Sequence, residues 1–287
     1  MDAQPAPLPA QPAQPLRACW LGRIAYRDAW DLQKRLVAAR AVGAVPDTLL
    51  LLEHDAVLTL GRGADPAHVR ATARQLRARH IEVIPVERGG EVTYHGPGQL
   101  VAYPILRLSD RRLLVRPLVR ALEAALAATC ADFGVTADRR DGHPGSWCAV
   151  GSPAPRKIGA LGLRIERGVS YHGIALNVDP DLHDFNLIDP CGMPGVVSTS
   201  VAQELGLSAE PPTTARVERA GQVFGAAFSA GLEAPLEWLS QHALEAGLAK
   251  AERAAEAERA ADAERAAEAQ RALDAGPALE AVAGVAS

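Results

Sequence analysis

Residues 157–177 read KIGALGLRIERGVSYHGIALN, and this stretch indicates two strands joined by a tight hairpin. Residues 157–166 and 169–177 are both strand-like, and only Arg167 and Gly168 separate them. A two-residue connection that contains glycine is typical of a β-hairpin, because such turns need positive φ angles that glycine adopts readily. We therefore expect an antiparallel pair of strands here.

Other elements are arranged irregularly around this hairpin. Strand-like runs cover residues 48–52, 56–60, 81–86 and 100–106, and helical patterns cover residues 28–41, 66–79, 113–133 and 213–231. Helices mixed with hairpin-connected strands predict an α/β domain of the α+β-like kind, with a mixed sheet. The chain has no regular βαβ repeat and no GxGxxG motif after a strand, so the sequence does not support a dinucleotide-binding fold.

The two ends of the chain differ from the middle in composition. Residues 1–16 are a Pro/Ala/Gln tract, which predicts a disordered leader. Residues 241–287 form a charged tail rich in Ala, Glu and Arg, and residues 249–273 have almost no apolar side chain larger than alanine. This composition favours a solvated single helix or a charged disordered segment. Residues 17–240 are left as one folded domain.

Composition excludes several classes of protein. The 287-residue chain has a net charge of −4, without the basic footprint of a nucleic-acid-binding protein. No apolar run reaches the roughly 18 residues of a membrane span, and the start resembles no signal peptide, so we expect a cytoplasmic protein. The cysteines, Cys19, Cys130, Cys148 and Cys191, form no CxxC pair and are expected to be free thiols.

A glycine-rich segment is the first candidate for a functional site. Residues 88–99 read RGGEVTYHGPGQ and contain four glycines. Backbone amides of such a loop can cradle a carbonyl oxygen, a carboxylate or a phosphate. The alternative is an ordinary glycine-rich turn between strands. The ionisable side chains and the tyrosine in the same segment favour a site.

Lys157 is the second candidate. The chain has only three lysines, Lys34, Lys157 and Lys250, and arginine supplies the other basic side chains. Because lysine can lose its proton in a suitable environment and arginine cannot, Lys157 is a candidate for proton chemistry. Gly159 and Gly162 follow it in the same strand, where a ligand could approach the backbone. A bulge or a packing contact would explain these glycines equally well.

Cys191 is the third candidate, within the segment DPCGMPG at residues 189–195. Loops carry reactive groups more often than core elements do, so this cysteine is the favoured nucleophile. The other three cysteines lie in an apolar helical run or beside tryptophan and are interpreted as structural. His95 and His172 each precede a glycine, and the interpretation as structural residues is preferred for a lone histidine.

Taken together, these segments resemble the lipoyl(octanoyl) transferase family of protein lipoylation. The glycine-rich loop, the KIGALG strand, the HGIALNV strand and the PCGMPG loop occur in the family's order between about residues 45 and 205. The resemblance implies a mixed sheet flanked by helices, like the catalytic domains of biotin protein ligases and lipoate-protein ligases. It also implies that residues 17–240 are an acyltransferase catalytic domain that holds the acyl chain in a tunnel.

The resemblance assigns roles to individual residues. Cys191 would carry the acyl group as a thioester, and Lys157 would favour the thiolate by charge pairing and later accept a proton from the attacking amine. The implied substrate-binding residues are Arg88, Gly89, Gly90, Glu91, Val92, Thr93, Tyr94, His95, Ala160, Leu161, Gly162, Gly173, Ile174 and Ala175.

The partners are also implied by the resemblance. Octanoyl-acyl carrier protein would be the donor. The acceptors would be lysines of lipoyl domains in the acyltransferase subunits of 2-oxoacid dehydrogenases and in the glycine cleavage H protein. No metal or cofactor is expected, because a thioester is already activated. We expect a monomer that binds neither membranes nor nucleic acid.

Three alternatives compete with this reading. An ATP-dependent lipoate or biotin ligase of the same fold would need no nucleophilic cysteine, and the Pro-Cys191-Gly sequence argues against it. A cysteine hydrolase could pair Cys191 with His95 or His172, but it would leave the lysine strand and the glycine-rich loop unexplained. A carrier-protein-binding module with an inert cysteine is the non-catalytic alternative.

Overall fold

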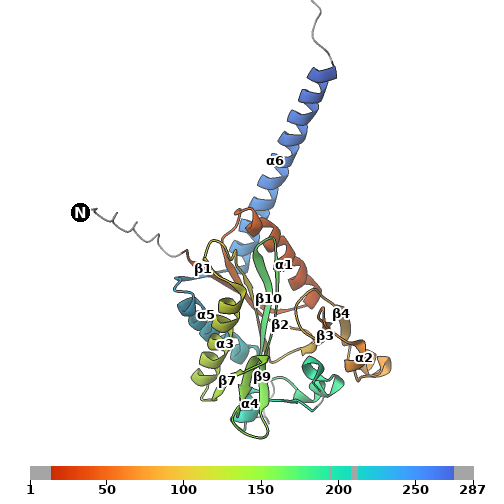
Figure 1. Cartoon of the computed structure of the whole chain (residues 1–287), viewed down its shortest axis with the longest axis vertical. Helices are drawn as coiled ribbons and strands as arrows, with labels where there is room; N and C mark the ends of the chain where they lie inside the picture. The colour runs from red at the N-terminus through yellow and green to blue at the C-terminus, as the bar shows by residue number, and fades with distance from the viewer. Residues whose placement is uncertain (1–13, 194, 208–212, 275–287) are drawn as a thin grey trace, which may run out of the picture.

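A nine-stranded mixed sheet forms the centre of the computed structural model, which describes residues 14–193, 195–207 and 213–274 (Figure 1). Across the sheet the strands are β12 (Leu236–Leu239), β1 (Leu16–Ile24), β2 (Thr48–His54), β6 (Gln99–Ile105), β10 (Val169–Asn177), β9 (Arg156–Glu166), β8 (His143–Cys148) and β7 (Ala137–Arg140). The two-residue strand β11 (Val197–Ser198) also pairs with β9. Strand β1 is parallel to both neighbours and the strands from β2 to β7 are antiparallel, which confirms the predicted mixed sheet.

The predicted hairpin is confirmed in β9 and β10. Glu166 pairs with Val169, and the two residues between them, Arg167 and Gly168, have φ angles of 51° and 78°. Positive φ at both positions is the signature of the two-residue turn whose twist matches that of paired strands. The hairpin sets Gly162 directly opposite Gly173.

Helices cover both faces of the sheet (Figure 1). Helices α3 (Val115–Asp132) and α5 (Thr214–Gly231) pack on one face, and α1 (Tyr26–Ala41) with the start of α6 (Gln241–Asp274) packs on the other. The short α4 (Val201–Glu204) follows β11. In β2, Leu49 and Leu51 are buried in the core under α3 and α5, whereas Leu50 and Leu52 are buried in the core under α1 and α6. Burial on both faces explains why this strand reads as an unbroken leucine run.

A smaller three-stranded sheet stands beside the main one. It contains β4 (Glu82–Pro85), β3 (Val57–Leu60) and β5 (Val92–His95), with β3 in the middle. Short helical segments surround it: η1 (Pro66–His68), α2 (Ala73–Ala78), η2 (Leu182–Leu187) and η3 (Pro190–Gly192). Strand β5 is formed by residues 92–95 of the glycine-rich loop, so this small sheet holds the loop against the main sheet.

The helix predicted over residues 66–79 is wrong as a single element. The backbone N–H groups of Arg70 and Ala71 donate to the Leu187 carbonyl instead of to a helix, which ends η1 early. Thr72 then starts α2, and its side chain and that of Gln75 form a reciprocal capping box. The Thr-x-x-Gln pattern is a known helix start, so the break had a signal in the sequence.

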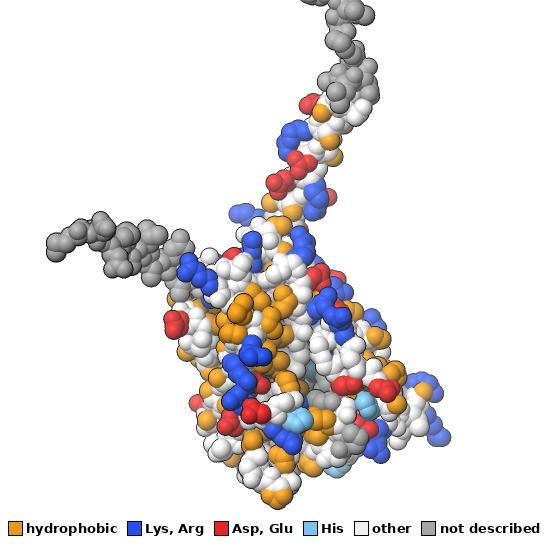
Figure 2. Space-filling view, in the orientation of Figure 1, with side chains coloured by type: hydrophobic (Ala, Val, Ile, Leu, Met, Phe, Trp, Pro, Cys, Tyr) orange, Lys and Arg blue, Asp and Glu red, His pale blue; other side chains and the backbone are white. Residues whose placement is uncertain are grey.

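Helix α6 is partly docked and partly projecting. Leu244, Leu248 and Ala251 are buried against the core, and Arg35 of α1 pairs with Glu252 at 2.7 Å. The buried core therefore continues past residue 240. Beyond these contacts the helix leaves the domain with basic and acidic side chains interspersed along it (Figure 2). Residues 1–13 of the predicted leader and residues 275–287 lie outside the described residues, and no described helix is long and apolar enough to cross a membrane.

Candidate active site

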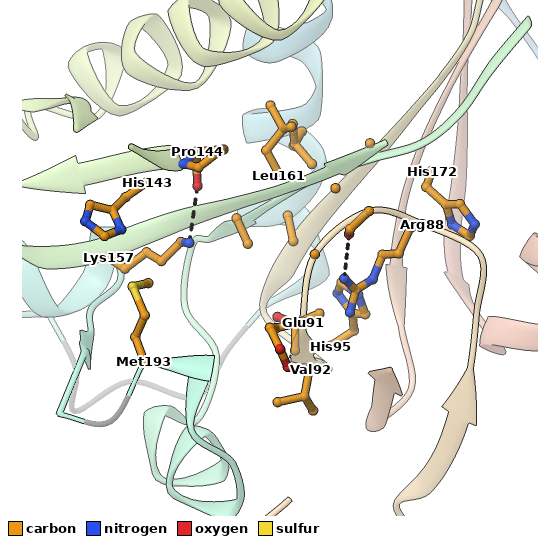
Figure 3. Close-up of a pocket in the computed structure, with 18 of the residues that line it drawn as sticks. Arg88, Glu91, Val92, His95, His143, Pro144, Lys157, Leu161, His172 and Met193 are labelled. Atoms are coloured by element: carbon orange, nitrogen blue, oxygen red, sulfur yellow. Dashed lines mark hydrogen bonds between the residues drawn. The ribbon is translucent and has the colours of Figure 1, made fainter. Parts of the chain in front are cut away.

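A cavity of about 460 Å³ lies where the small sheet meets strands β9 and β10 (Figure 3). Its size falls within the roughly 300–1,000 Å³ that is common for small-molecule sites. The lining residues are Tyr26, Arg88, Gly89, Gly90, Glu91, Val92, Thr93, His95, Tyr103, Gly142, His143, Pro144, Lys157, Ala160, Leu161, Gly162, His172, Gly173, Ile174, Ala175 and Met193. The four segments that carry the family resemblance thus all contribute to one cavity, the PCGMPG loop through Met193.

The first half of the glycine-rich loop is held by Arg88. The Arg88 side chain is buried, and its guanidinium donates to the Thr59 carbonyl at 2.7 Å and to the Thr59 hydroxyl at 2.9 Å. On the other side, the Gly89 N–H donates to the Leu163 carbonyl at 2.9 Å. The loop therefore spans from β3 to β9, and the buried guanidinium ties it to the small sheet.

Glycines on the neighbouring strands let the loop approach closely. A Cβ atom at Gly61 would lie 2.3 Å from the Gly90 carbonyl oxygen, and one at Gly162 would lie 2.8 Å from the Gly89 carbonyl oxygen. Both distances are shorter than any real carbon contact, so larger residues would displace the loop. This wedged position favours a substrate cradle over an ordinary turn between two strands.

Lys157 occupies one end of the cavity. Its side chain is 7% exposed, and its Nζ donates to the Pro144 carbonyl at 3.2 Å. The ammonium also lies 5.1 Å from the centre of the Trp147 ring, within the range of a cation–π contact. Figure 3 shows Met193 on the opposite side of the lysine from Pro144. A cation is thus held where the polar end of a bound acyl group could lie.

The turn η3, which contains Cys191, rests on the glycine-rich loop. The Asp189 N–H donates to the His68 carbonyl at 2.8 Å, and the Gly192 N–H donates back to the Asp189 carbonyl at 3.0 Å. Gly192 has a φ of +64°, and a Cβ atom there would come within 3.0 Å of the Glu91 side chain. The turn and the loop are therefore in direct contact, and Met193 leads from the turn to the cavity.

The histidines at the inner end of the cavity are neutral. His95 Nδ1 donates to Gln99 Oε1 at 2.7 Å, and Gln99 Nε2 donates to Asn177 Oδ1 at 2.9 Å, which fixes the amide and the ring. Burial lowers the pKa of His95 to about 3 and the pKa of His172 to about 4. Such weak bases suit an uncharged wall better than the proton chemistry of a cysteine hydrolase.

Tyr94 is the predicted substrate-binding residue that does not line the cavity. Its hydroxyl donates to Asp184 Oδ2 at 2.8 Å, and its ring packs edge-on against Phe185. Neighbouring residues of a strand point to opposite faces, so Thr93 and His95 reach the cavity while Tyr94 enters the core beneath. The other thirteen predicted substrate-binding residues, and Lys157, line the cavity.

Several lining residues were missed by the sequence analysis. Tyr26 and Tyr103 resemble ordinary core aromatics, and nothing in their surroundings marks them. Gly142, His143 and Pro144 belong to the run DGHPGSW at residues 141–147, whose two glycines flank a proline. This run resembles the glycine-rich loop in composition and could have been singled out for the same reason.

The remaining cysteines have the character of structural residues, as predicted. Burial raises the pKa of Cys19 and of Cys148 to about 11, and that of Cys130 to about 12. A thiol with so high a pKa carries almost no thiolate at neutral pH and is a poor nucleophile.

Comparison with known proteins identifies the family. Residues 25–227 match the family described as the lipoyl protein ligase A/B catalytic domain. The chain is 49% identical to the octanoyltransferase of Chloroflexus aurantiacus, over 65% of this chain and 83% of that protein. It is 46% identical to the octanoyltransferase of Acidobacterium capsulatum, over 71% of this chain and 88% of that protein.

Solved structures share the fold. A crystal structure of lipoate-protein ligase A bound with ATP superposes with a TM-score of 0.59, at 16% identity, over 83% of this chain and 94% of that one. This likeness confirms the predicted fold class. From the matched domain and the identity to its relatives, the chain belongs to the octanoyltransferases of the lipoyl protein ligase A/B catalytic domain family.

Proposed function

We propose that this chain moves an octanoyl group from octanoyl-acyl carrier protein to a lysine of a lipoyl domain, through a thioester on Cys191. The observation that carries the proposal is the buried Lys157 at one end of a cavity whose wall includes Met193, two residues after Cys191. The relatives named octanoyltransferase support the acyl group.

The first half-reaction forms the acyl-enzyme. The Cys191 thiolate attacks the thioester carbonyl of the donor, so that a new S–C bond forms and the bond to the carrier's sulfur breaks. The Lys157 ammonium balances the thiolate before attack and then gives its proton to the departing thiolate of the carrier. Lys157 is left neutral beside the acyl-enzyme.

The second half-reaction uses this neutral amine. The acceptor lysine attacks the thioester of Cys191, the C–N bond forms, and the C–S bond breaks. The attacking nitrogen loses a proton to Lys157, which regenerates the ammonium beside the released thiolate. One lysine thus serves both steps, and the acyl group changes partners without any further activation.

The acyl chain would lie along β9 and β10. Gly162 and Gly173 pair across these two strands and both line the cavity, where a ligand can approach a backbone that carries no side chain. Leu161, Ile174 and Val92 supply apolar walls. Burial of apolar surface is worth about 25 cal/mol per Å², so these walls favour an alkyl chain over a polar ligand.

The dependence on ATP tests the proposal against the related ligases. Purified octanoyl-acyl carrier protein and a lipoyl domain should give octanoylated domain without ATP. Free octanoate with ATP and Mg²⁺ should give none. The reverse pattern would make the chain a ligase that activates free acids. The acceptors, lipoyl domains of 2-oxoacid dehydrogenase subunits and the glycine cleavage H protein, as well as the monomeric state and cytoplasmic location, stay sequence-based predictions.

A further inference from the structure

We infer that Glu123 is a positioning residue for Lys157, and that it acts through the peptide group between Pro144 and Gly145. The inference rests on the proposed function, because it concerns the lysine that moves protons in both half-reactions. Glu123 lies on α3 and does not line the cavity, so any effect on transfer must pass through an intervening group.

The intervening group is a single peptide unit. Its N–H, from Gly145, donates to Glu123 Oε1 at 3.3 Å, and its carbonyl, from Pro144, accepts from Lys157 Nζ at 3.2 Å. A trans peptide is planar, and its N–H and C=O point in opposite directions. A carboxylate that fixes the N–H therefore also fixes the direction of the carbonyl toward the lysine (Figure 3).

Glu123 is an unusual residue for its position. It is 6% exposed on the face of α3 that otherwise buries apolar side chains such as Leu122 and Leu126. Burial of a carboxylate is unfavourable unless its oxygens are paired. Arg120 pairs with Oε2 at 2.8 Å, and the Gly145 N–H takes Oε1. The side chain thus links the helix to the strand that carries the carbonyl.

The backbone of β8 is shaped around this contact. Gly145 has a φ of +120°, and a Cβ atom there would lie 2.3 Å from the Gly159 carbonyl oxygen. Trp147 pairs with Lys157 and Ser146 pairs with Gly159, so β9 has one residue more than β8 at this point. Such a bulge turns the local backbone and re-aims a group toward a site.

The Trp147 ring is a second neighbour of the lysine. This ring is fully buried, and its Nε1 donates to the His143 carbonyl at 3.0 Å, which fixes the ring plane. The Lys157 ammonium lies 5.1 Å from the ring centre. Because one N–H is held by the Pro144 carbonyl, the lone pair of the neutral amine must point in another direction.

This arrangement predicts how Glu123 variants behave. Glu123→Ala leaves the Gly145 N–H without its acceptor and frees the carbonyl to turn, so both half-reactions should slow, by up to about 100-fold for a displacement of about 1 Å. Glu123→Gln keeps an oxygen acceptor and should restore most of the rate. Thr129→Val removes another buried hydrogen bond of α3, from Thr129 Oγ1 to the Ala125 carbonyl, and should leave transfer unchanged.

A double variant separates positioning from a general loss of structure. Each half-reaction is followed by rapid quench, and the pH midpoint of Cys191 alkylation by iodoacetamide is measured for each variant with its melting temperature. Glu123→Ala should raise that midpoint in the wild-type background and should have no further effect on rates or midpoint once Lys157 is alanine. If Glu123→Ala slows the Lys157→Ala enzyme by the same factor, or if Glu123→Gln is as slow as Glu123→Ala, the inference is wrong. If Lys157→Ala itself leaves both half-reactions unchanged, the proposed function fails instead.

Discussion

The glycine-rich loop and the turn that carries Cys191 lie against each other but are held in different ways. The loop is fixed from both sides, by Arg88 to Thr59 of β3 and by Gly89 to Leu163 of β9. The turn is fixed at Asp189, whose N–H donates to the His68 carbonyl and whose carboxylate pairs with Arg70 at 3.1 Å. The proposed substrate cradle is thus held by both sheets, while Cys191, the proposed nucleophile, belongs to a short turn. Changes in the turn should alter the chemistry, whereas changes in the loop should alter binding and stability together.

The largest effect is expected in the turn. Cys191→Ser should remove stable acyl-enzyme and reduce transfer to less than a few per cent of wild type, because a serine hydroxyl is far less acidic than a thiol and is not ionised by pairing with the Lys157 ammonium. The melting temperature should stay close to that of wild type, because the substitution replaces one sulfur atom by oxygen. Transfer assays and thermal melts check both statements, with Cys130→Ala as a control that should keep turnover per folded molecule even where it loses stability. Substantial transfer by the serine variant would show that the acyl group does not pass through Cys191.

Lys157 variants should separate the two half-reactions. Lys157→Arg keeps a positive charge that can favour the Cys191 thiolate, but arginine cannot lose its proton at working pH. Discharge of the acyl-enzyme should therefore slow more than its formation, and acyl-enzyme should accumulate. Lys157→Ala should slow both steps. Rapid-quench measurement of each step on the two variants decides the matter, and equal slowing of both steps in a well-folded arginine variant would limit Lys157 to an electrostatic role.

A pair of glycines tests the loop. Gly61→Ala places a Cβ atom 2.3 Å from the Gly90 carbonyl oxygen, whereas the same change at Gly63 places it at an ordinary 3.6 Å. Gly61→Ala should lower stability by about 1–3 kcal/mol, as overpacking does, and raise KM for the acyl donor. Gly63→Ala should change neither. Urea unfolding and steady-state kinetics measure both effects, and similar behaviour of the two variants would mean that the close approach of the loop is unimportant.

The smallest effect concerns pH. Burial lowers the pKa of His54 to about 4, that of His95 to about 3 and that of His172 to about 4. In the unfolded chain histidine titrates near 6.5. Between about pH 6.5 and pH 4 the unfolded chain therefore binds protons that the folded chain does not, and stability falls as the pH falls, by at most about 1.4 kcal/mol per pH unit for each histidine.

Urea unfolding at a series of pH values from 7.5 to 5 checks this slope. His95→Gln should make stability fall less steeply with acid, because one buried histidine no longer resists protonation. His242→Gln is the control, since His242 is exposed near the start of α6, and it should leave the slope as in wild type. An identical slope in all three proteins would mean that the inner wall of the cavity does not resist protonation.

The regions of the molecule also differ in how well their structure could be predicted from the sequence. The glycine-rich loop was predictable because its glycines and charged residues all lie within residues 88–99. The hairpin was predictable because two residues can join two strands only through a tight turn. Tyr94 shows the limit, since its place in the core depends on strand alternation that a run of twelve residues does not reveal. The hydrogen bond from Lys157 to the Pro144 carbonyl could not be predicted. Every residue has a backbone carbonyl, so the identity of the residue does not mark it as a partner. Leu244 and Leu248, spaced by four, were a visible signal that α6 docks before it projects.

The most direct test of the proposed Cys191 thioester is a single-turnover experiment that is followed by intact mass spectrometry. The enzyme is mixed with octanoyl-acyl carrier protein in the absence of acceptor, and the protein and its peptides are weighed. The thioester mechanism predicts the mass of one octanoyl group on Cys191, and its complete transfer when a lipoyl domain is added. An unmodified enzyme that still octanoylates the domain, or an octanoyl group on any other residue, would contradict the thioester mechanism.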